Sequence, residues 1–151
     1  MNPFLKCEIL HMDDFFLPKS RVTPERLAEV GGNIDYERFA EEVVTPWTKS
    51  LPIRYRRFDC GDQVFSNPIE LSPTHLLVVE GVYSLHPLFR PMMDLKVMVT
   101  VNPWKKALRI LLRNGSNWRL TLKHLSRWIP LENRYFRVEK LSESVDRIVR
   151  T

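Results

Sequence analysis

The chain has 151 residues, of which 44% are hydrophobic and 27% are charged, and its formal net charge is +5. These proportions are ordinary for a globular chain, and one domain is the simplest expectation for this length. No run of about 18 apolar residues is present, which argues against a membrane-spanning helix. Two cysteines, Cys7 and Cys60, are too few for a disulfide scaffold, so the composition indicates a cytoplasmic protein with reduced thiols.

The positive charge indicates an anionic partner, and nucleic acid, a membrane surface and nucleotide phosphates would all suit it. The basic residues concentrate after residue 100, which favours a local phosphate-binding region over a general coat for polyanions. No recognised RNA- or DNA-binding motif is present. We therefore expect a small-molecule partner, and neither nucleic acid nor a membrane.

The first half of the chain alternates short strands with helices. Residues 2–10 predict a lead-in and one strand, and a loop follows with at most one helical turn, at Pro24 to Ala28. Asp35 is a good N-cap for the next helix, and Pro46 should end or kink that helix. Arg54 to Phe58 is predicted to be a strand or an extended segment of alternating basic and aromatic residues.

Two further strands precede a well-defined helix. His75 to Val79 is a short apolar run that ends at Glu80, which is typical of a strand buried on both faces of a parallel sheet. Leu95 to Val101 is a second run of this kind, rich in β-branched residues. The next helix is predicted to begin after Asn102 and to end before Gly115.

This helix has two chemically different faces. The apolar face, which we expect in the core, consists of Trp104, Leu108, Leu111 and Leu112. The basic face consists of Lys105, Arg109 and Arg113, which recur every four residues. A further helix is predicted to run to Trp128 and to be interrupted at Pro130, with helical character resuming to Lys140 and a last strand at Asp146 to Val149. Strands that alternate with helices predict an α/β fold with a parallel sheet flanked by helices.

Two of the apolar strands end in acids, one at Asp13 and the other at Glu80. Parallel strands bring these ends to the same edge of a sheet, where ligands of open α/β folds bind. Acids next to a basic helix suit phosphoryl transfer, which needs a group to orient the attacking hydroxyl, a metal site and cations on the phosphate. Each feature also has an interpretation without a catalytic role. The acid pair at Asp13 and Asp14 could mark a surface turn, and Glu80 could be a strand-end acid that accepts hydrogen bonds from backbone donors. Arg109 and Arg113 could belong to a solvated helix face.

Four short sequence motifs occur in the order found in uridine-kinase-like P-loop kinases. These motifs are His11 to Phe16, Gly31 to Tyr36, Val79 to Tyr83 and Trp128 to Asn133. The likeness continues through Arg113-Asn114-Gly115 and to Phe136, so it covers nearly the whole chain. Each motif alone is weak evidence for the family, but the four motifs in this order are specific to it. The chain resembles this family, which implies one kinase domain over residues 1–151 with a helical, lid-like region at 102–128.

The resemblance implies ATP-dependent phosphoryl transfer to a hydroxyl of a small molecule, with a nucleoside as the expected acceptor and with ATP and Mg²⁺ as cofactors. Asp13 matches the family acid that accepts or orients the hydroxyl proton. Glu80 resembles the acid that holds magnesium, usually through water. Arg109 and Arg113 resemble lid arginines that close over the transferring phosphate.

The acceptor site is less well defined by the resemblance. Asp35, Phe16 and Tyr55 fall near family positions that hold the sugar and the base. However, the stretch from Leu51 to Pro73 departs most from uridine kinases, with Asp59-Cys60-Gly61-Asp62 where the nucleoside-binding segment should be. This departure puts the acceptor in question and not the reaction class.

The family's phosphate loop, which ends in Gly-Lys-Ser/Thr, is absent from these residues. The five glycines are at 31, 32, 61, 81 and 115, and none precedes lysine. In the family, the strand before this loop lies beside the strand that ends at Glu80, so we expect an apolar groove there. Losing that strand forfeits on the order of 10 kcal/mol of apolar burial, which is comparable with the stability of a domain.

The absent loop leaves three explanations. The chain is a fragment of a full kinase, a half whose loop comes from a partner chain or a second copy, or a decayed homologue that binds or regulates without catalysis. We favour the first, so the expected fold is an N-terminally truncated P-loop NTPase-like sheet that is not competent for catalysis alone.

Overall fold

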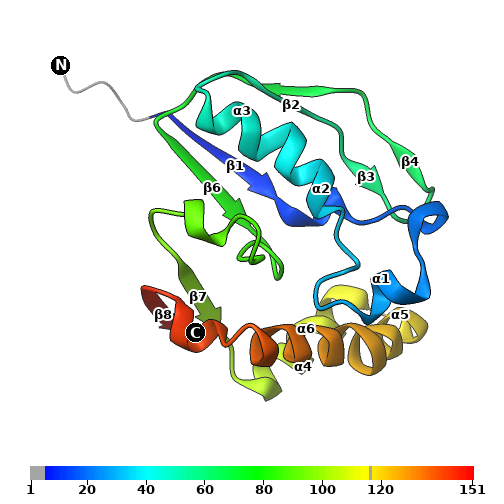
Figure 1. The fold of residues 1–151 in the computed structure, drawn as a ribbon. Helices are drawn as coiled ribbons and strands as arrows, with labels where there is room; N and C mark the ends of the chain where they lie inside the picture. Colours follow the sequence, from blue (N-terminus) through cyan, green and yellow to red (C-terminus); the bar gives the residue numbers. More distant parts are fainter. Residues whose placement is uncertain (1–5, 116) are drawn as a thin grey trace. The chain divides into compact units, whose positions relative to one another are not determined.

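The computed structural model describes residues 6–115 and 117–151. Contacts between Cα atoms divide the chain into two compact units, Met1–Pro91 (unit 1) and Met92–Thr151 (unit 2). Each unit contains one pair of parallel strands together with helices (Figure 1). None of the described helices is both long enough and apolar enough to cross a membrane.

The parallel pair of unit 1 joins β1 (Cys7–His11) to β6 (Leu76–Glu80), and these strands lie side by side in Figure 1. Their register runs from Cys7 opposite Leu76 to His11 opposite Glu80. The predicted first strand is confirmed, and the second begins one residue later than predicted. Parallel pairing far along the chain requires a crossover connection, which residues 12–75 provide.

The crossover of unit 1 contains short helices and then a twisted ribbon. The helical elements are η1 (Met12–Phe15), η2 (Lys19–Arg21), α1 (Pro24–Ala28), α2 (Tyr36–Phe39), η3 (Ala40–Val44) and α3 (Thr45–Thr48). In the ribbon, β2 (Ile53–Tyr55) pairs antiparallel with β5 (Ile69–Leu71), and β3 (Phe58–Asp59) pairs antiparallel with β4 (Val64–Phe65). The helical turn predicted at Pro24 to Ala28 and the extended segment from Arg54 are both confirmed, and η4 (Arg90–Met92) follows β6.

The helix that Asp35 caps continues past Pro46. The carboxylate of Asp35 accepts a hydrogen bond of 3.3 Å from the backbone N–H of Arg38, as expected of an N-cap. Proline cannot donate the backbone hydrogen bond of an α-helix interior. Here the wider π-helical turn η3 directly precedes Pro46, and the helix changes type there instead of breaking. The predicted end at Pro46 is thus a change of helix type, and the helix ends at Thr48.

Aromatic rings dominate the core of unit 1. The rings of Phe15 and Phe39 meet edge to face with centroids 5.0 Å apart, and Phe15 stacks on Tyr55 at 5.4 Å. All three residues are buried, as is Met12. Such ring pairs contribute about 0.5–1.5 kcal/mol each beyond their buried area. Because Met12 and Phe15 are both fully buried, the η1 turn between them is held firmly against the core.

The expectation that β6 is buried on both faces is wrong. Leu76 and Val78 are 50% and 38% exposed, and Ile9, which is paired with Val78, is 54% exposed. Alternate residues of a strand point to opposite faces, so one face of the β1–β6 pair is covered and the other carries an open apolar surface. The described part of unit 1 provides no layer for this second face.

Unit 2 pairs β7 (Val97–Thr100) in parallel with β8 (Arg147–Arg150). Its helical elements are α4 (Pro103–Asn114), α5 (Trp118–Lys123), the π-helical η5 (His124–Trp128), α6 (Ile129–Val138) and α7 (Leu141–Ser144). The Asn102 side chain caps α4 by accepting a 3.0 Å hydrogen bond from the backbone N–H of Trp104, and Gly115 ends α4 at a φ of +53°. Both predicted signals of this helix are confirmed.

Pro130 does not interrupt the helix of unit 2, contrary to prediction. The π-helical turn η5 ends at Trp128, and Pro130 then lies in the first turn of α6. The missing backbone donor of proline is tolerated in a first turn. Pro130 is therefore accommodated in the same way as Pro46.

The predicted core face of α4 is also wrong. The residues expected in the core are exposed: Trp104 by 84%, Leu108 by 55%, Leu111 by 54% and Leu112 by 72%. The inner face instead carries Ile110, which is 7% exposed, and Lys106, whose Nζ lies 2.8 Å from Oε2 of Glu132 on α6. Packing of Ile110 and this ion pair orient the helix, so the longer apolar stripe faces outward.

Candidate active site

The parallel register of unit 1 brings two acids, Asp13 and Glu80, to the same end of the strand pair. His11 and Glu80 are opposite each other at the carboxyl ends of β1 and β6, and Nδ1 of His11 contacts Oε1 of Glu80. Asp13 follows β1 directly, within the η1 turn. The predicted meeting of the Asp13 and Glu80 strand ends at the same edge is confirmed. His11, which was expected to be a strand-end side chain without a role in the site, joins them because strand pairing puts it opposite Glu80.

A glycine allows these two strand ends to approach closely. Gly81 has a φ of +125°, and a Cβ atom built on it would lie 2.9 Å from Cβ of Met12. Only glycine adopts this backbone conformation readily, and a side chain would also push against Met12. Gly81 therefore sets the spacing between the turn that carries Asp13 and the strand that ends at Glu80.

The two neighbouring aspartates have different surroundings. Asp13 is exposed, whereas the side chain of Asp14 is only 16% exposed and its Oδ2 lies 3.2 Å from Nε of Arg57. Tyr55 lies close by, and burial raises its pKa, with the negative charge of Asp14 acting in the same direction. Asp14 is thus held within the protein, whereas the Asp13 side chain lies at the surface.

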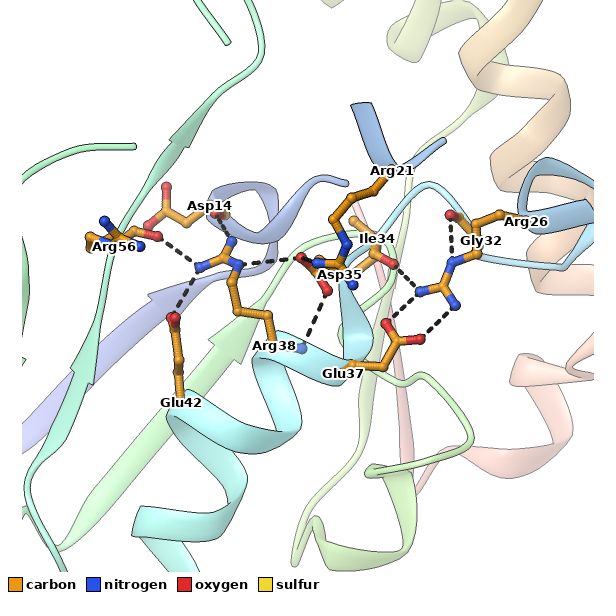
Figure 2. A network of polar contacts seen from close by, with 10 residues as sticks. All are labelled: Asp14, Arg21, Arg26, Gly32, Ile34, Asp35, Glu37, Arg38, Glu42 and Arg56. Atoms are coloured by element: carbon orange, nitrogen blue, oxygen red, sulfur yellow. Dashed lines mark hydrogen bonds and ion pairs between the residues drawn. The ribbon is translucent and has the colours of Figure 1, made fainter. Parts of the chain in front are cut away.

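Asp35, a predicted substrate-binding residue, is fully buried. Nη1 of Arg21 lies 2.5 Å from its Oδ2, and Nε of Arg38 lies 3.7 Å from the same oxygen (Figure 2). A ligand cannot contact this carboxylate while Arg21 occupies it. In this conformation Asp35 contributes to the site by holding the two arginines in place.

Arg38 connects three separate segments of unit 1. Nη2 donates to the backbone carbonyl of Asp14 at 2.7 Å, and Nη1 donates to the carbonyl of Arg56 at 2.9 Å and to Oε2 of Glu42 at 3.0 Å (Figure 2). The guanidinium also lies 4.3 Å from the ring centroid of Phe15. Burial lowers the pKa of Arg38. This residue fixes the backbone of the acid-bearing turn, and no sequence motif marked it.

A second arginine fixes the loop before α2. Nη1 and Nη2 of Arg26 each donate to the carboxylate of Glu37 at 2.7 Å, and Nη2 also donates to the carbonyl of Ile34 at 3.0 Å (Figure 2). Two-point contacts between arginine and a carboxylate are among the stronger polar interactions. Arg26 thereby holds the loop that leads into Asp35.

A cavity of 260 Å³ lies beside this loop. It is lined by Leu17, Arg21, Thr23, Glu25, Arg26, Glu29 and Glu37. Most of the lining is charged, and Arg21, Arg26 and Glu37 are already engaged in ion pairs. Pockets for planar organic ligands are predominantly apolar, so this cavity does not have the character of a nucleobase site.

The remaining predicted acceptor residues differ in accessibility. Tyr55 is 3% exposed and its ring packs on Phe15, whereas Phe16 is half-buried and forms an isolated β-bridge with Ile34. Of the three residues assigned to the acceptor, Phe16 alone offers accessible surface in this conformation. The acceptor roles of all three stay predictions.

The two predicted lid arginines belong to unit 2. Arg109 is exposed on α4. The side chain of Arg113 lies outside the part of the chain that the structure describes. Their role in closing over a phosphate therefore stays a prediction.

The described side chains fit a water-mediated magnesium site better than a closed metal centre. Among the residues described, no group of three or more His, Cys, Asp or Glu could hold a metal ion. Magnesium usually keeps several waters and binds one or two protein carboxylates together with substrate phosphates. Glu80 is 56% exposed at its strand end, which fits such a role.

No family model matches the chain. None of the curated proteins matches it either. Solved structures do match, and one is a possible uridine kinase from Bacillus stearothermophilus, with a TM-score of 0.68 over 96% of this chain and 72% of that chain. The chain has a uridine-kinase-like P-loop kinase fold.

A second structure supports the same fold. YFH7 from Saccharomyces cerevisiae, a candidate P-loop kinase with a circular permutation, matches with a TM-score of 0.62 over 96% of this chain and 57% of that chain. Sequence identity is 17% to the Bacillus protein and 14% to YFH7. At these identities the likeness shows the fold alone, and this chain spans little more than half of YFH7.

Proposed function

We propose that this kinase-like fold serves ATP-dependent phosphoryl transfer to a hydroxyl group of a small molecule. The observation that carries the proposal is the juxtaposition, in a uridine-kinase-like P-loop fold, of the turn bearing Asp13 with the strand end at Glu80. Ligands of such folds bind beyond the carboxyl ends of the strands. The exposed Asp13 would therefore lie where we propose that the acceptor hydroxyl enters.

Asp13 would act as the group that orients the acceptor hydroxyl and accepts its proton. As the hydroxyl oxygen bonds to the terminal phosphorus of ATP, the bond from that phosphorus to the bridging oxygen breaks and ADP leaves. A carboxylate within hydrogen-bond reach of the hydroxyl suits this role at neutral pH. Arg38 supports it by holding the backbone carbonyl of the neighbouring Asp14.

Charge on the phosphates would be balanced by cations. Magnesium, when bound, neutralises phosphate oxygens, and Glu80 would hold it through water. Arg109 and Arg113 would contribute guanidinium groups, whose geometry matches phosphate oxygens. For the acceptor we propose a nucleoside contacted by Phe16, with Tyr55 and Asp35 supporting that surface from within the protein.

The phosphate loop would come from polypeptide outside these 151 residues, because they contain no Gly-Lys-Ser/Thr sequence. The open apolar surface of the β1–β6 pair, with Ile9, Leu76 and Val78, is where we propose that the additional segment packs. A longer version of this chain, a partner chain or a second copy could supply it. The motivation is that an uncovered apolar sheet face costs burial that another strand or helix restores.

The decisive experiment measures phosphoryl transfer from ATP to a panel of nucleosides by a version of the chain that carries an upstream Gly-Lys-Ser/Thr segment. Asp13→Asn should lower kcat by about 10²–10⁴-fold. Asp94→Asn, which alters an exposed acid with no role in the proposed site, is the matched control and should leave kcat unchanged. Full turnover by Asp13→Asn would remove the proposed role of Asp13.

A second candidate function is non-catalytic binding or regulation by a kinase-shaped protein. The absence of the Gly-Lys-Ser/Thr sequence from these residues is the observation that favours it. Calorimetry with magnesium-ATP on the 151-residue chain separates the two. Micromolar binding would count against a non-catalytic role.

A further inference from the structure

The outer face of α4 is an exposed apolar stripe. Trp104, Leu108, Leu111 and Leu112 are each more than half exposed, and their spacing of four, seven and eight residues places them on one side of the helix. Isolated exposed leucines are normal on protein surfaces, but a contiguous stripe marks an interaction site. The packed side of the same helix, at Ile110, is distinct from this stripe.

All charged residues in the segment around this stripe are basic. Residues 103–128 contain seven lysines and arginines and no aspartate or glutamate. Lys105 and Arg109 are exposed on α4, next to the apolar stripe on its basic side. A partner that covers the stripe must therefore be apolar where it meets the leucines and anionic where it meets Lys105 and Arg109.

The next helical segment repeats the pattern. Trp118 and Leu122 of α5 are 63% and 53% exposed, and Leu125 of η5 is 43% exposed. These residues are spaced by four and seven positions, as on α4. Arg119 is exposed among them. The combination is thus a property of the whole segment and not of one helix.

Charge and chemistry select among the possible occupants. A second copy of this segment would bring its exposed Lys105, Arg109 and Arg119 toward the same residues of the first copy, and these like charges repel each other. A nucleic acid would pair with the cations but would leave the leucine stripe in water. A bilayer that contains anionic lipids satisfies both parts, because acyl chains accept leucine, headgroups accept lysine and arginine, and tryptophan favours the interface between them.

We propose that α4, together with the α5–η5 segment, is a docking surface for a lipid bilayer that contains anionic lipids. The helix would lie in the plane of the interface with Trp104, Leu108, Leu111 and Leu112 inserted among the lipids. This is peripheral binding, and it differs from the expectation from the sequence that no membrane is involved. It does not depend on the proposed phosphoryl transfer.

The test is co-sedimentation of the 151-residue chain with vesicles of phosphatidylcholine alone and of phosphatidylcholine with about one-third phosphatidylserine. We expect binding to the anionic vesicles, a blue shift of tryptophan emission that Trp104→Phe diminishes, and loss of binding in high salt. Equal binding to both vesicle types, or binding to neither, would overturn the proposal.

Variants separate docking from simple charge attraction. The double variant Leu108→Ser/Leu112→Ser and the single variant Lys105→Glu should each weaken binding at least tenfold. Leu88→Ser, which alters a leucine of unit 1 that is 61% exposed, should bind as the unmodified chain does. Circular dichroism checks that each variant is folded.

Two outcomes would point to another occupant. If the double leucine variant binds anionic vesicles as tightly as the unmodified chain, the contact is electrostatic only and the docking surface is wrong. If sedimentation velocity shows a dimer that the same variant dissociates, the stripe joins two copies and the bilayer is not its partner.

Discussion

Units 1 and 2 each contain one parallel strand pair, but they differ in whether the charged side chains discussed above are buried or exposed. In unit 1, Asp35 is fully buried and the Arg38 side chain is 10% exposed, and both are engaged in a polar network. In unit 2, Lys105 and Arg109 are exposed on α4. Buried polar networks that are satisfied fix geometry, whereas exposed cations remain available to partners.

The apolar side chains show the same contrast. Unit 1 packs Phe15, Phe39 and Tyr55 into a ring cluster with centroid distances of 5.0–5.4 Å. Unit 2 leaves the stripe of α4 outward and buries Ile110. The packing of unit 1 therefore holds a few groups in fixed positions, whereas unit 2 leaves the apolar stripe of α4 exposed to possible partners. Substitutions in both units test this contrast.

The largest effect is expected from the buried carboxylate of Asp35 in unit 1, which faces the half-exposed Arg21 and the largely buried Arg38. Asp35→Asn removes the charge that Arg21 and Arg38 face, and breaking a buried pair from one side typically costs about 3 kcal/mol or more. In unit 2, Glu132→Gln breaks the partly exposed pair with Lys106, which should cost less than about 1 kcal/mol. Urea denaturation of the two variants measures both values. Equal losses in the free energy of unfolding would show that the two ion pairs contribute equally to stability.

The next effect concerns two glycines with positive φ. Gly81→Ala combines an unfavourable φ of +125° with a contact of 2.9 Å to Met12, and we expect a loss of about 2–4 kcal/mol. Gly115→Ala meets no heavy atom within 4 Å at its φ of +53°, so strain alone should cost about 1–2 kcal/mol. Thermal unfolding provides the comparison. A larger shift for Gly115→Ala would contradict the close approach of the two strand ends.

A smaller effect tests the orientation of α4. Ile110→Ala should destabilise the protein by about 2 kcal/mol because it removes buried volume. Leu112→Ala changes a side chain that is 72% exposed and should change the free energy of unfolding by less than about 0.5 kcal/mol. Denaturant titration distinguishes the two. If Leu112→Ala were the costlier change, the face expected from the sequence would be the inner one after all.

The smallest effect is a titration in unit 1. Burial raises the pKa of Tyr36 to about 12, and its hydrogen bond to Glu29 acts in the same direction. Because the folded pKa exceeds the ordinary value of 10.0, the contribution to stability is present below pH 10 and is lost as pH rises toward 12. Absorbance titration, with Tyr36→Phe as reference, measures the pKa. Glu29→Gln should lower it, and an unchanged value would refute the contribution of that hydrogen bond.

Local signals in the sequence were reliable where they depend on one or two residues. Asp35 and Asn102 cap their helices as predicted, and Gly115 ends α4. The turn at Pro24 to Ala28 has the predicted bounds. Capping and backbone preferences act within a few residues, so they can be read without knowing the rest of the fold.

Signals that depend on neighbouring elements failed. Pro46 was expected to end or kink its helix and Pro130 to interrupt one, but a π-helical turn precedes each of them and the helices continue. The outward face of α4 could not be foreseen, because the ion pair between Lys106 and Glu132 joins residues far apart in sequence. Arg38 was missed for the same reason, since it donates to the backbone carbonyls of Asp14 and Arg56, which lie in distant segments.

By itself, the sequence determined the order of the parallel strands and the longer helices, the helix caps and the two acids that follow apolar strands. These features follow from short-range backbone chemistry and from alternation along the chain. Only the tertiary structure decided that His11 stands opposite Glu80, that Arg21 and Arg38 close over Asp35, and which side of α4 faces outward. Those outcomes depend on which distant groups meet, and pairing over long distances is set by the free energy of the whole packed arrangement and not by any one segment.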